Sequence, residues 1–342
     1  MIHARGLVQT FMTGQGKKKT PVHAVAGVDL DVAEGEVVGF LGPNGAGKTT
    51  TLRMLTTLLK PTAGTATVAG FDVASQAQDV RRSIGYVSQA GSTFSSAIAG
   101  DEVMDHGMLY GMSRRDAERK GKELFEQLDL PGLWRRMPKN MSGGQKRRLD
   151  IAMGLIHEPN LVFLDEPTTG LDPQARANLW EHIAGLRSRQ GVTVFLTTHY
   201  LDEADHLADR IVIIDKGRIV ASDTADNLKA QVSGDLVDLE VAAEDQVEVA
   251  REKLDSIASG VEVEGRHVRG RVQRAGRAVP GLLRDLDSNG VFLDSIEVLR
   301  PTLDDVFLTL TGRSLRDAEA AAEATDATGP AAGNDVLEGA EA

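Results

Sequence analysis

Compact apolar runs alternate with amphipathic segments over residues 24–230 of this chain. Four of the runs have the length and continuity of strands that are covered on both faces: VVGFLG (37–42), LVFLD (161–165), VTVFLTT (192–198) and RIVIID (210–215). Strands that alternate with helices in this way are typical of an α/β domain with a largely parallel sheet. We therefore expect an α/β domain over residues 1–230.

Within this domain the pattern changes to mostly helical over about residues 95–156. The segment SRRDAERKGKELFEQLDL (113–130) begins at a serine that can cap a helix, and Leu124, Phe125 and Leu128 fall on one helical face. This pattern predicts an inserted helical subdomain.

The pattern resets after residue 230. A strand is expected at 235–241, followed by a helix at 244–257, a hairpin at 261–273, a helix at 276–290 and a strand at 292–299. The order β-α-β-β-α-β predicts a small α+β domain of ferredoxin-like type over residues 231–313. Residues 314–342 carry seven acids against Arg316 alone and almost no large apolar side chains, so we expect a disordered acidic tail.

The composition excludes several classes of site. The 342 residues include no cysteine, which rules out disulfides, thiolate metal sites and cysteine nucleophiles. No apolar run approaches the ~18 residues that cross a bilayer, and MIHARGLVQT (1–10) lacks a secretory apolar core, so we expect a cytoplasmic protein. The net charge of −12 argues against a nucleic acid partner, because duplex binding needs a concentrated basic face.

A phosphate-binding loop is indicated by GFLGPNGAGKTT (39–50), which follows a predicted strand and opens a predicted helix. Its glycines let backbone N–H groups turn toward phosphate oxygens, and the helix N-terminus adds partial positive charge. We expect Lys48 to contact the β- and γ-phosphates of a nucleotide and Thr49 to bind Mg²⁺. A glycine-rich turn with a solvated lysine is the weaker alternative.

Two acidic residues stand at the end of the buried strand 161–165. In α/β folds, ligands bind at this carboxyl end of the strands. Asp165 can hold the Mg²⁺ there, and Glu166 can orient an attacking water or accept its proton. The alternative is that the two acids cap the next helix.

Two further polar residues follow predicted strands: His199 in FLTTHY (195–200) and Gln89 in IGYVSQA (84–90). His199 would lie near the γ-phosphate, where its imidazole can stabilise developing charge. Gln89 can bind Mg²⁺, orient water or relay movement of the helical insert. Taken alone, a structural role for His199 and a surface position for Gln89 are the better interpretations.

The motifs together resemble the nucleotide-binding subunit of an ABC transporter. They are Lys48, Gln89, SGGQ at 142–145, Asp165-Glu166, GLD at 170–172 and His199, in this order and spacing. The resemblance covers about residues 5–230 and implies a P-loop NTPase fold that binds ATP and Mg²⁺. The implied phosphate loop comprises Gly42, Pro43, Asn44, Gly45, Ala46, Gly47, Lys48, Thr49 and Thr50.

The resemblance also assigns roles outside this loop. Asp165 corresponds to the metal-binding aspartate and Glu166 to the catalytic glutamate. His199 corresponds to the switch histidine, and Gln89 to the Q-loop residue that faces the permease. Asp172 corresponds to the acid of the D-loop. An N-terminal aromatic residue usually stacks on adenine in this family, and Phe11 is the candidate here, with core packing as the alternative.

The signature residues Ser142, Gly143, Gly144 and Gln145 imply a dimer. In this family they complete the nucleotide site of a second subunit, so two ATP molecules hold a head-to-tail pair together. The hydroxyl of Ser142 and the following amides, at a helix N-terminus, would bind the γ-phosphate of the partner's ATP.

The segments TTHYLDEADHLADRIVIIDKGRIVASDTADNLKAQ (197–231) and RPTLDDVFLTLTG (300–312) resemble the daunorubicin-resistance type of exporter ATPase. Such proteins pair with a separate permease of the ABC-2 type, which implies a position at the cytoplasmic face of the membrane. Export of a drug or hydrophobic natural product is the first hypothesis. One alternative is export of a lipid or polysaccharide. The other is that the chain is a soluble ATPase that acts on ribosomes or chromosomes. The sequence does not select the transported substrate.

Overall fold

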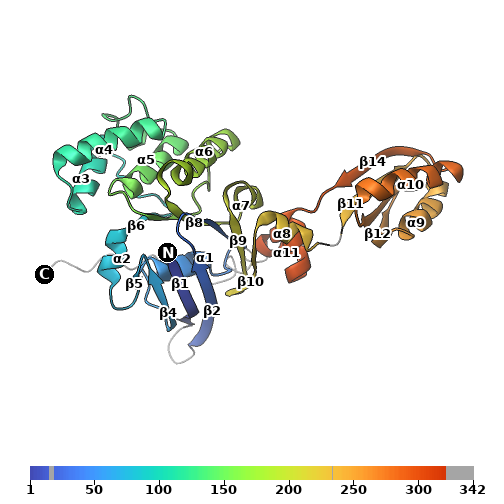
Figure 1. Cartoon of the computed structure of the whole chain (residues 1–342), viewed down its shortest axis with the longest axis horizontal. Coiled ribbons are helices and arrows are strands. Elements are labelled where there is room, and N and C mark those ends of the chain that lie inside the picture. Colours follow the sequence, from blue (N-terminus) through green and yellow to red (C-terminus); the bar gives the residue numbers. More distant parts are fainter. Residues whose placement is uncertain (15–18, 233, 321–342) are drawn as a thin grey trace. The chain divides into compact units, whose positions relative to one another are not determined.

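The computed structural model describes residues 1–14, 19–232 and 234–320, with the backbone only at 188–190. The chain divides into two units. The first contains Met1–Asp223 together with the segment that begins at Leu315, and the second contains Thr224–Ser314. Figure 1 shows the elements of both units.

A six-stranded sheet forms the centre of the first unit. Its order is β10 (Arg218–Asp223), β9 (Arg210–Asp215), β3 (Val37–Leu41), β8 (Thr193–Thr198), β7 (Leu161–Asp165) and β6 (Ile84–Val87). The strands are parallel except for β10, which pairs antiparallel with β9. Every residue of β3, β7 and β8 is buried, which explains their continuous apolar sequences. The predicted parallel α/β core is confirmed.

Helices connect these strands, and a second sheet packs against part of them. The helices are α1 (Lys48–Leu55), α2 (Ala77–Ser83), α6 (Pro173–Gln190) and α7 (Leu201–Leu207). The second sheet is antiparallel, in the order β2 (Thr20–Val32), β1 (Ile2–Thr13), β4 (Ala63–Val68) and β5 (Phe71–Asp72). One apolar cluster joins Leu7 of this sheet, Leu52 of α1 and Phe40 of the central sheet, so α1 is fixed from two sides.

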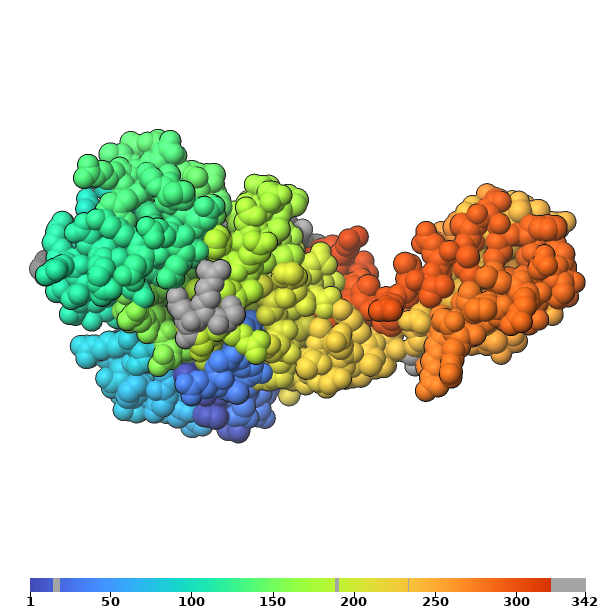
Figure 2. Space-filling view, turned by 45° about the horizontal axis from the view of Figure 1, so that its top comes forward, coloured from blue at the N-terminus to red at the C-terminus, as the bar shows by residue number. Residues whose placement is uncertain are grey.

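The helical insert lies between β6 and β7 in the chain. It consists of α3 (Ala99–Leu109), α4 (Arg114–Gln127), a 3-10 turn (Pro138–Asn140) and α5 (Gly143–Leu155). Ser113 caps α4 by accepting a hydrogen bond from the Asp116 amide, and Leu124 and Phe125 are buried as their spacing predicts. Figure 2 shows the insert as a green lobe.

The second unit has the predicted strand and helix order. Its sheet runs β12 (Ala258–Glu264), β13 (His267–Val272), β11 (Asp235–Val241) and β14 (Leu293–Leu299), and every neighbouring pair is antiparallel. The helices α9 (Val247–Asp255) and α10 (Ala275–Ser288) contribute to its apolar core. The unit also holds α8 (Ala225–Ala230) and α11 (Leu303–Thr311), which pack together, so it begins at Thr224 rather than at residue 231.

The start of the expected acidic tail is a correction. Residues 315–320 are helical, and Leu315 and Ala318 are buried, with 3% and 2% of their surface exposed. These two apolar residues are spaced three apart, on one helical face, which anchors the short segment to the first unit. The rest of the expected tail, 321–342, lies outside the described residues.

Candidate functional site

The phosphate loop connects β3 to α1 and borders a cleft of about 290 Å³. Two of its glycines are required by close approach: a Cβ at Gly42 would lie 2.3 Å from the Ile214 carbonyl oxygen, and one at Gly47 would lie 2.5 Å from that of Ala24. The cleft is lined by Ala24, Pro43, Asn44, Gly45, Gly47, Lys48, Thr49, Thr50, Gln89 and Glu166. The structure thus places most of the expected loop residues around one hollow.

Lys48 lies at the base of this cleft with only 4% of its surface exposed. Its ammonium group donates to the carbonyl oxygens of Gly42, at 2.7 Å, and Pro43, at 3.2 Å, and lies 3.4 Å from Oε1 of Glu166. Burial lowers the pKa of Lys48, and the negative charge of Glu166 opposes that shift. The site therefore contains a buried cation with few competing hydration contacts, as phosphate binding requires.

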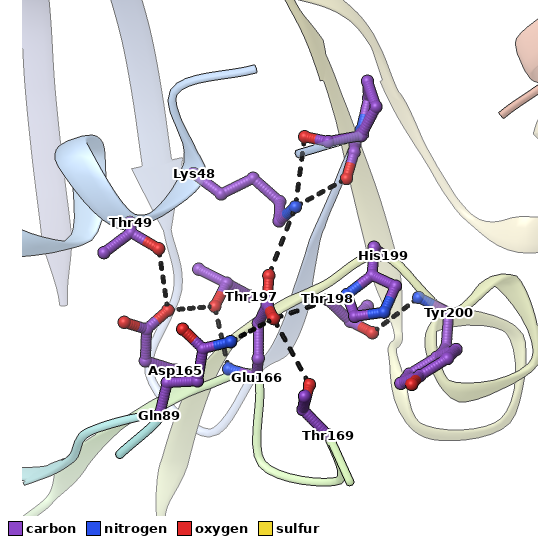
Figure 3. Close-up of polar contacts among 12 residues, drawn as sticks. Lys48, Thr49, Gln89, Asp165, Glu166, Thr169, Thr197, Thr198, His199 and Tyr200 are labelled. Carbon is purple, nitrogen blue, oxygen red and sulfur yellow. Dashed lines mark hydrogen bonds and ion pairs between the residues drawn. The ribbon is translucent and has the colours of Figure 1, made fainter. Parts of the chain in front are cut away.

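Asp165 and Thr49 meet at the end of β7. The Thr49 hydroxyl donates to Oδ1 of Asp165 at 3.3 Å, and the Thr197 hydroxyl of β8 donates to the same oxygen at 2.7 Å (Figure 3). A carboxylate and a hydroxyl oxygen this close fit Mg²⁺, which protein sites bind through one or two carboxylates together with phosphate oxygens.

Glu166 receives contacts from four directions (Figure 3). Its Oε2 accepts hydrogen bonds from Gln89 Nε2, at 2.9 Å, and the Thr169 hydroxyl, at 3.2 Å, and lies 3.4 Å from His199 Nδ1. Lys48 faces Oε1. Burial by itself raises the pKa of this carboxyl, but His199 and Lys48 outweigh burial and hold the pKa at about 2. Glu166 is therefore an ionised acceptor at neutral pH.

The structure brings together the residues predicted from four separate motifs: Lys48, Gln89, Asp165, Glu166 and His199. Gln89 reaches Glu166, and its side-chain contact does not include Asp165.

The signature residues and Asp172 are not among the residues that line the cleft. Ser142 caps α5: its hydroxyl accepts from the Gln145 amide at 3.2 Å, and the Gln145 side chain accepts from the Ser142 amide at 3.0 Å. Asp172 caps α6 by accepting from the Ala175 amide at 2.9 Å. Ser142, Gly143 and Asp172 are exposed, so an approaching molecule can reach them.

Phe11 is also outside the residues that line the cleft. It lies on β1 opposite Val22, and 40% of its surface is exposed. The alternative of core packing is therefore wrong, and stacking on adenine stays a prediction.

Two residues that the sequence did not single out have central contacts. Thr197, two residues before His199, binds both Asp165 and the Glu166 amide through its hydroxyl. Arg147, which follows the signature on α5, donates to carbonyl oxygens around Glu166. Their proximity to motifs was visible in the sequence, but these contacts join segments 18 to 32 residues apart and only the fold reveals them.

None of the helices in the described part of the chain is both long and apolar enough to cross a bilayer.

Comparisons with known proteins agree with this geometry. Residues 25–169 match the family model "ABC transporter", and residues 224–311 match "ATP-binding protein DrrA1-3-like, C-terminal domain". The chain is 43% identical to the daunorubicin resistance ATP-binding protein DrrA3 of Streptomyces coeruleorubidus, over 92% of this chain and 100% of that protein. It is 37% identical to the Nod factor export ATP-binding protein I of Burkholderia lata, over 86% of this chain and 93% of that protein.

Among solved structures, the fold resembles a dimeric ATP-binding cassette in a post-hydrolysis state bound to ADP and Pi. The TM-score is 0.60 at 25% identity, over 66% of this chain and 98% of the other.

Proposed function

This chain belongs to the ABC transporter family of ATP-binding proteins. On this basis we propose that it powers export of a drug or hydrophobic natural product through a separate membrane permease. The chain is an ABC-type ATPase, as its family and fold show. The observation that carries the choice of cargo is its similarity, over 92% of this chain, to a daunorubicin resistance ATP-binding protein.

We infer these roles from the contacts around the cleft. Lys48 binds the phosphates of ATP, and the amides of the loop surround their oxygens. Thr49 and Asp165 would hold Mg²⁺, which would neutralise charge on the phosphates. Glu166 accepts a hydrogen bond from the attacking water and orients it toward the γ-phosphate. His199, beside Glu166, donates to the γ-phosphate and stabilises charge that develops there.

Two copies of the chain are needed for this site. Ser142 and Gly143 are exposed at the N-terminus of α5, and none of the signature residues lines its own chain's cleft. They would complete the site of a partner in a head-to-tail dimer, with Asp172 at the same interface. The related solved cassette is a dimer, which supports this arrangement.

The permease would bind next to Gln89. A groove of about 270 Å³ is lined by Ser88 and Ser92 on either side of Gln89, by Tyr110 at the end of α3, and by Met153 on α5. The groove touches both the central sheet and the helical insert, so an inserted permease segment can move Gln89 and hence its contact with Glu166. This position implies that the protein works at the cytoplasmic face of the membrane.

Export of a lipid or polysaccharide is a second candidate, because the chain is similar to a Nod factor export protein as well as to drug resistance proteins. The test is to reconstitute the protein in proteoliposomes with an ABC-2 type permease that binds it. ATP-dependent accumulation of a fluorescent anthracycline inside inverted vesicles, absent with Lys48→Ala, supports drug export. ATPase activity that is stimulated by lipid or oligosaccharide and indifferent to the anthracycline contradicts it.

A further inference from the structure

Arg147 is a buried arginine whose hydrogen bonds all reach backbone carbonyl oxygens. It lies on α5, five residues after Ser142, and 7% of its surface is exposed. Its guanidinium donates to Ser88 at 2.5 Å, Pro167 at 2.7 Å, Asp165 at 2.9 Å and Glu166 at 3.4 Å. One side chain therefore joins the segment before Gln89 to three consecutive residues around the catalytic glutamate.

The backbone of Glu166 needs such support. Its φ of 43° lies in the left-handed region, which is costly for a residue with a side chain. The Glu166 amide is held by the carbonyl and hydroxyl oxygens of Thr197, each at 3.1 Å. Arg147 holds the carbonyl side of the same residue. A strained backbone persists only where its surroundings fix it from several directions, and Thr197 and Arg147 provide that here.

The same helix holds both ends of the Gln89 loop (residues 88–92). Arg147 donates to the Ser88 carbonyl oxygen, and Asp150, one turn further along α5, accepts from the amide and hydroxyl of Ser92. Gln89 then reaches Glu166 from between these two anchors. Side chains of one helix, α5, therefore hold both the Gln89 loop and the backbone of Glu166 in position.

The chemistry favours arginine specifically at this position. A guanidinium directs several N–H groups in one plane at fixed angles, whereas a lysine ammonium is a single point on a flexible stem. Only the planar group can contact the Gln89 loop and the Glu166 segment at once. Among the described residues, none of the hydrogen-bond partners of Arg147 is a carboxylate. Burial of a charged group costs free energy, so we expect a functional reason for an arginine that only holds neutral carbonyl oxygens.

We propose that Arg147 is a positioning residue for ATP hydrolysis, which holds the left-handed backbone of Glu166 and the Gln89 loop in one arrangement so that the Glu166 carboxylate meets the attacking water. This rests on the proposed role of Glu166.

The test compares Arg147→Lys and Arg147→Gln with the wild-type full chain, assayed with its permease. We expect kcat to fall about tenfold or more in Arg147→Gln, with less loss in Arg147→Lys, while the KM for ATP changes less than about twofold. Because nucleotide still binds and hydrolysis is slow, the ATP-bound dimer should accumulate on size exclusion, as it should for Glu166→Gln.

The matched control is Arg210→Gln. Arg210 is a half-buried arginine of the same unit, bound to Glu36 and to the Asp31 carbonyl oxygen, and it does not line the cleft. A structural arginine should lower the melting temperature and leave kcat per folded molecule unchanged, so Arg147 variants that behave like Arg210→Gln overturn the proposal. Folded Arg147 variants with normal kcat also overturn it.

The Glu166→Gln variant separates this proposal from the proposed role of Glu166. If Glu166→Gln hydrolyses ATP normally, the role of Glu166 is wrong and the proposal for Arg147 fails with it. If Glu166→Gln is inactive and the Arg147 variants are active, only the role of Arg147 is refuted.

Discussion

The ammonium nitrogen of Lys48 lies 3.4 Å from Oε1 of Glu166, so the cation that binds nucleotide also faces the carboxylate that would act on it (Figure 3). A phosphate group that binds Lys48 has to share or replace this contact. Together with His199, Lys48 keeps the pKa of Glu166 at about 2 against the effect of burial. Phosphate binding should therefore raise the pKa of Glu166 and make it a better acceptor for the proton of the attacking water.

Replacement of Glu166 by Gln should separate binding from hydrolysis. The amide keeps the size of the side chain, and removal of a negative charge beside Lys48 should leave ATP affinity equal or higher. Hydrolysis should fall by ~10² or more, because the group that orients the water is lost. Steady-state ATPase assays and nucleotide titration measure both effects, with exposed Glu126→Gln as the control. Normal hydrolysis in the variant would remove Glu166 from the mechanism.

The sequence predicted those parts of the site that short motifs carry. Lys48, Asp165 and His199 each belong to a stretch in which strand, turn and polar residue are adjacent, so local pattern was sufficient. Arg147 and Thr197 could not be assigned in this way, because their contacts depend on which carbonyl oxygens the folded loops bring within reach. The fold class could also be predicted, because the alternation of strands and helices is visible in the local pattern of apolar residues.

The start of the expected acidic tail was predicted wrongly, because composition was given more weight than local pattern. Average composition over residues 314–342 favoured disorder, yet two small or medium apolar side chains, Leu315 and Ala318, are enough to bury one face of residues 315–320. Composition averages over a window longer than this helix, so the pattern was hidden by the acidic residues that come after it.

The half-buried imidazole of His157 should make the stability of the fold depend on pH. Its ring stacks on Tyr110 with centroids 3.7 Å apart, and Nε2 lies 3.0 Å from the Ile84 carbonyl oxygen. Burial lowers the pKa of His157 from 6.5 to about 4, assisted by nearby His106 and opposed by the Ile84 contact. Since the folded pKa is below the unfolded one, the unfolded chain binds more protons between these values, and stability should fall as pH drops from about 6.5 to 4.

The measurement is urea unfolding from pH 7 to pH 4.5. The loss attributable to His157 should be at most about 3 kcal/mol, and it should be reduced in His157→Gln, which cannot take up a proton. His23→Gln, at an exposed histidine, is the control and should leave the slope unchanged. An identical slope in His157→Gln and wild type would show that the dependence comes from other groups.

Two truncations should separate the contribution of residues 315–320 from that of residues 321–342. Deletion of 315–342 removes the buried side chains of Leu315 and Ala318, and should cost roughly 2–3 kcal/mol relative to deletion of 321–342 alone. Glu319 also acts electrostatically on Lys48, so its removal should strengthen ATP binding, roughly two- to tenfold at low salt. Calorimetry and nucleotide titration of both truncations test this, with Glu319→Gln to isolate the charge. Equal melting temperatures for the two truncations would mean that residues 315–320 do not contribute to the stability of the first unit.

The position of Ser142 outside its own chain's cleft leads to a complementation test. Lys48→Ala and Ser142→Arg subunits should each be inactive alone, because every site of each homodimer carries one lesion. In a mixed head-to-tail dimer, one site receives both lesions and the other receives neither. With random pairing, about a quarter of the wild-type sites should return, so ATPase activity should reappear on co-expression with the permease.

Absence of recovery needs a second measurement, because strong coupling between the two sites would also suppress it. Cysteines can be placed at Ser142 and at Asn44 of the phosphate loop, since the chain has no cysteine of its own. A disulfide that joins two subunits in the presence of ATP supports the exchange of Ser142 between chains, and leaves coupling as the reason for any lost activity. A disulfide confined to single chains would show that Ser142 serves its own nucleotide, and the head-to-tail arrangement would then be wrong.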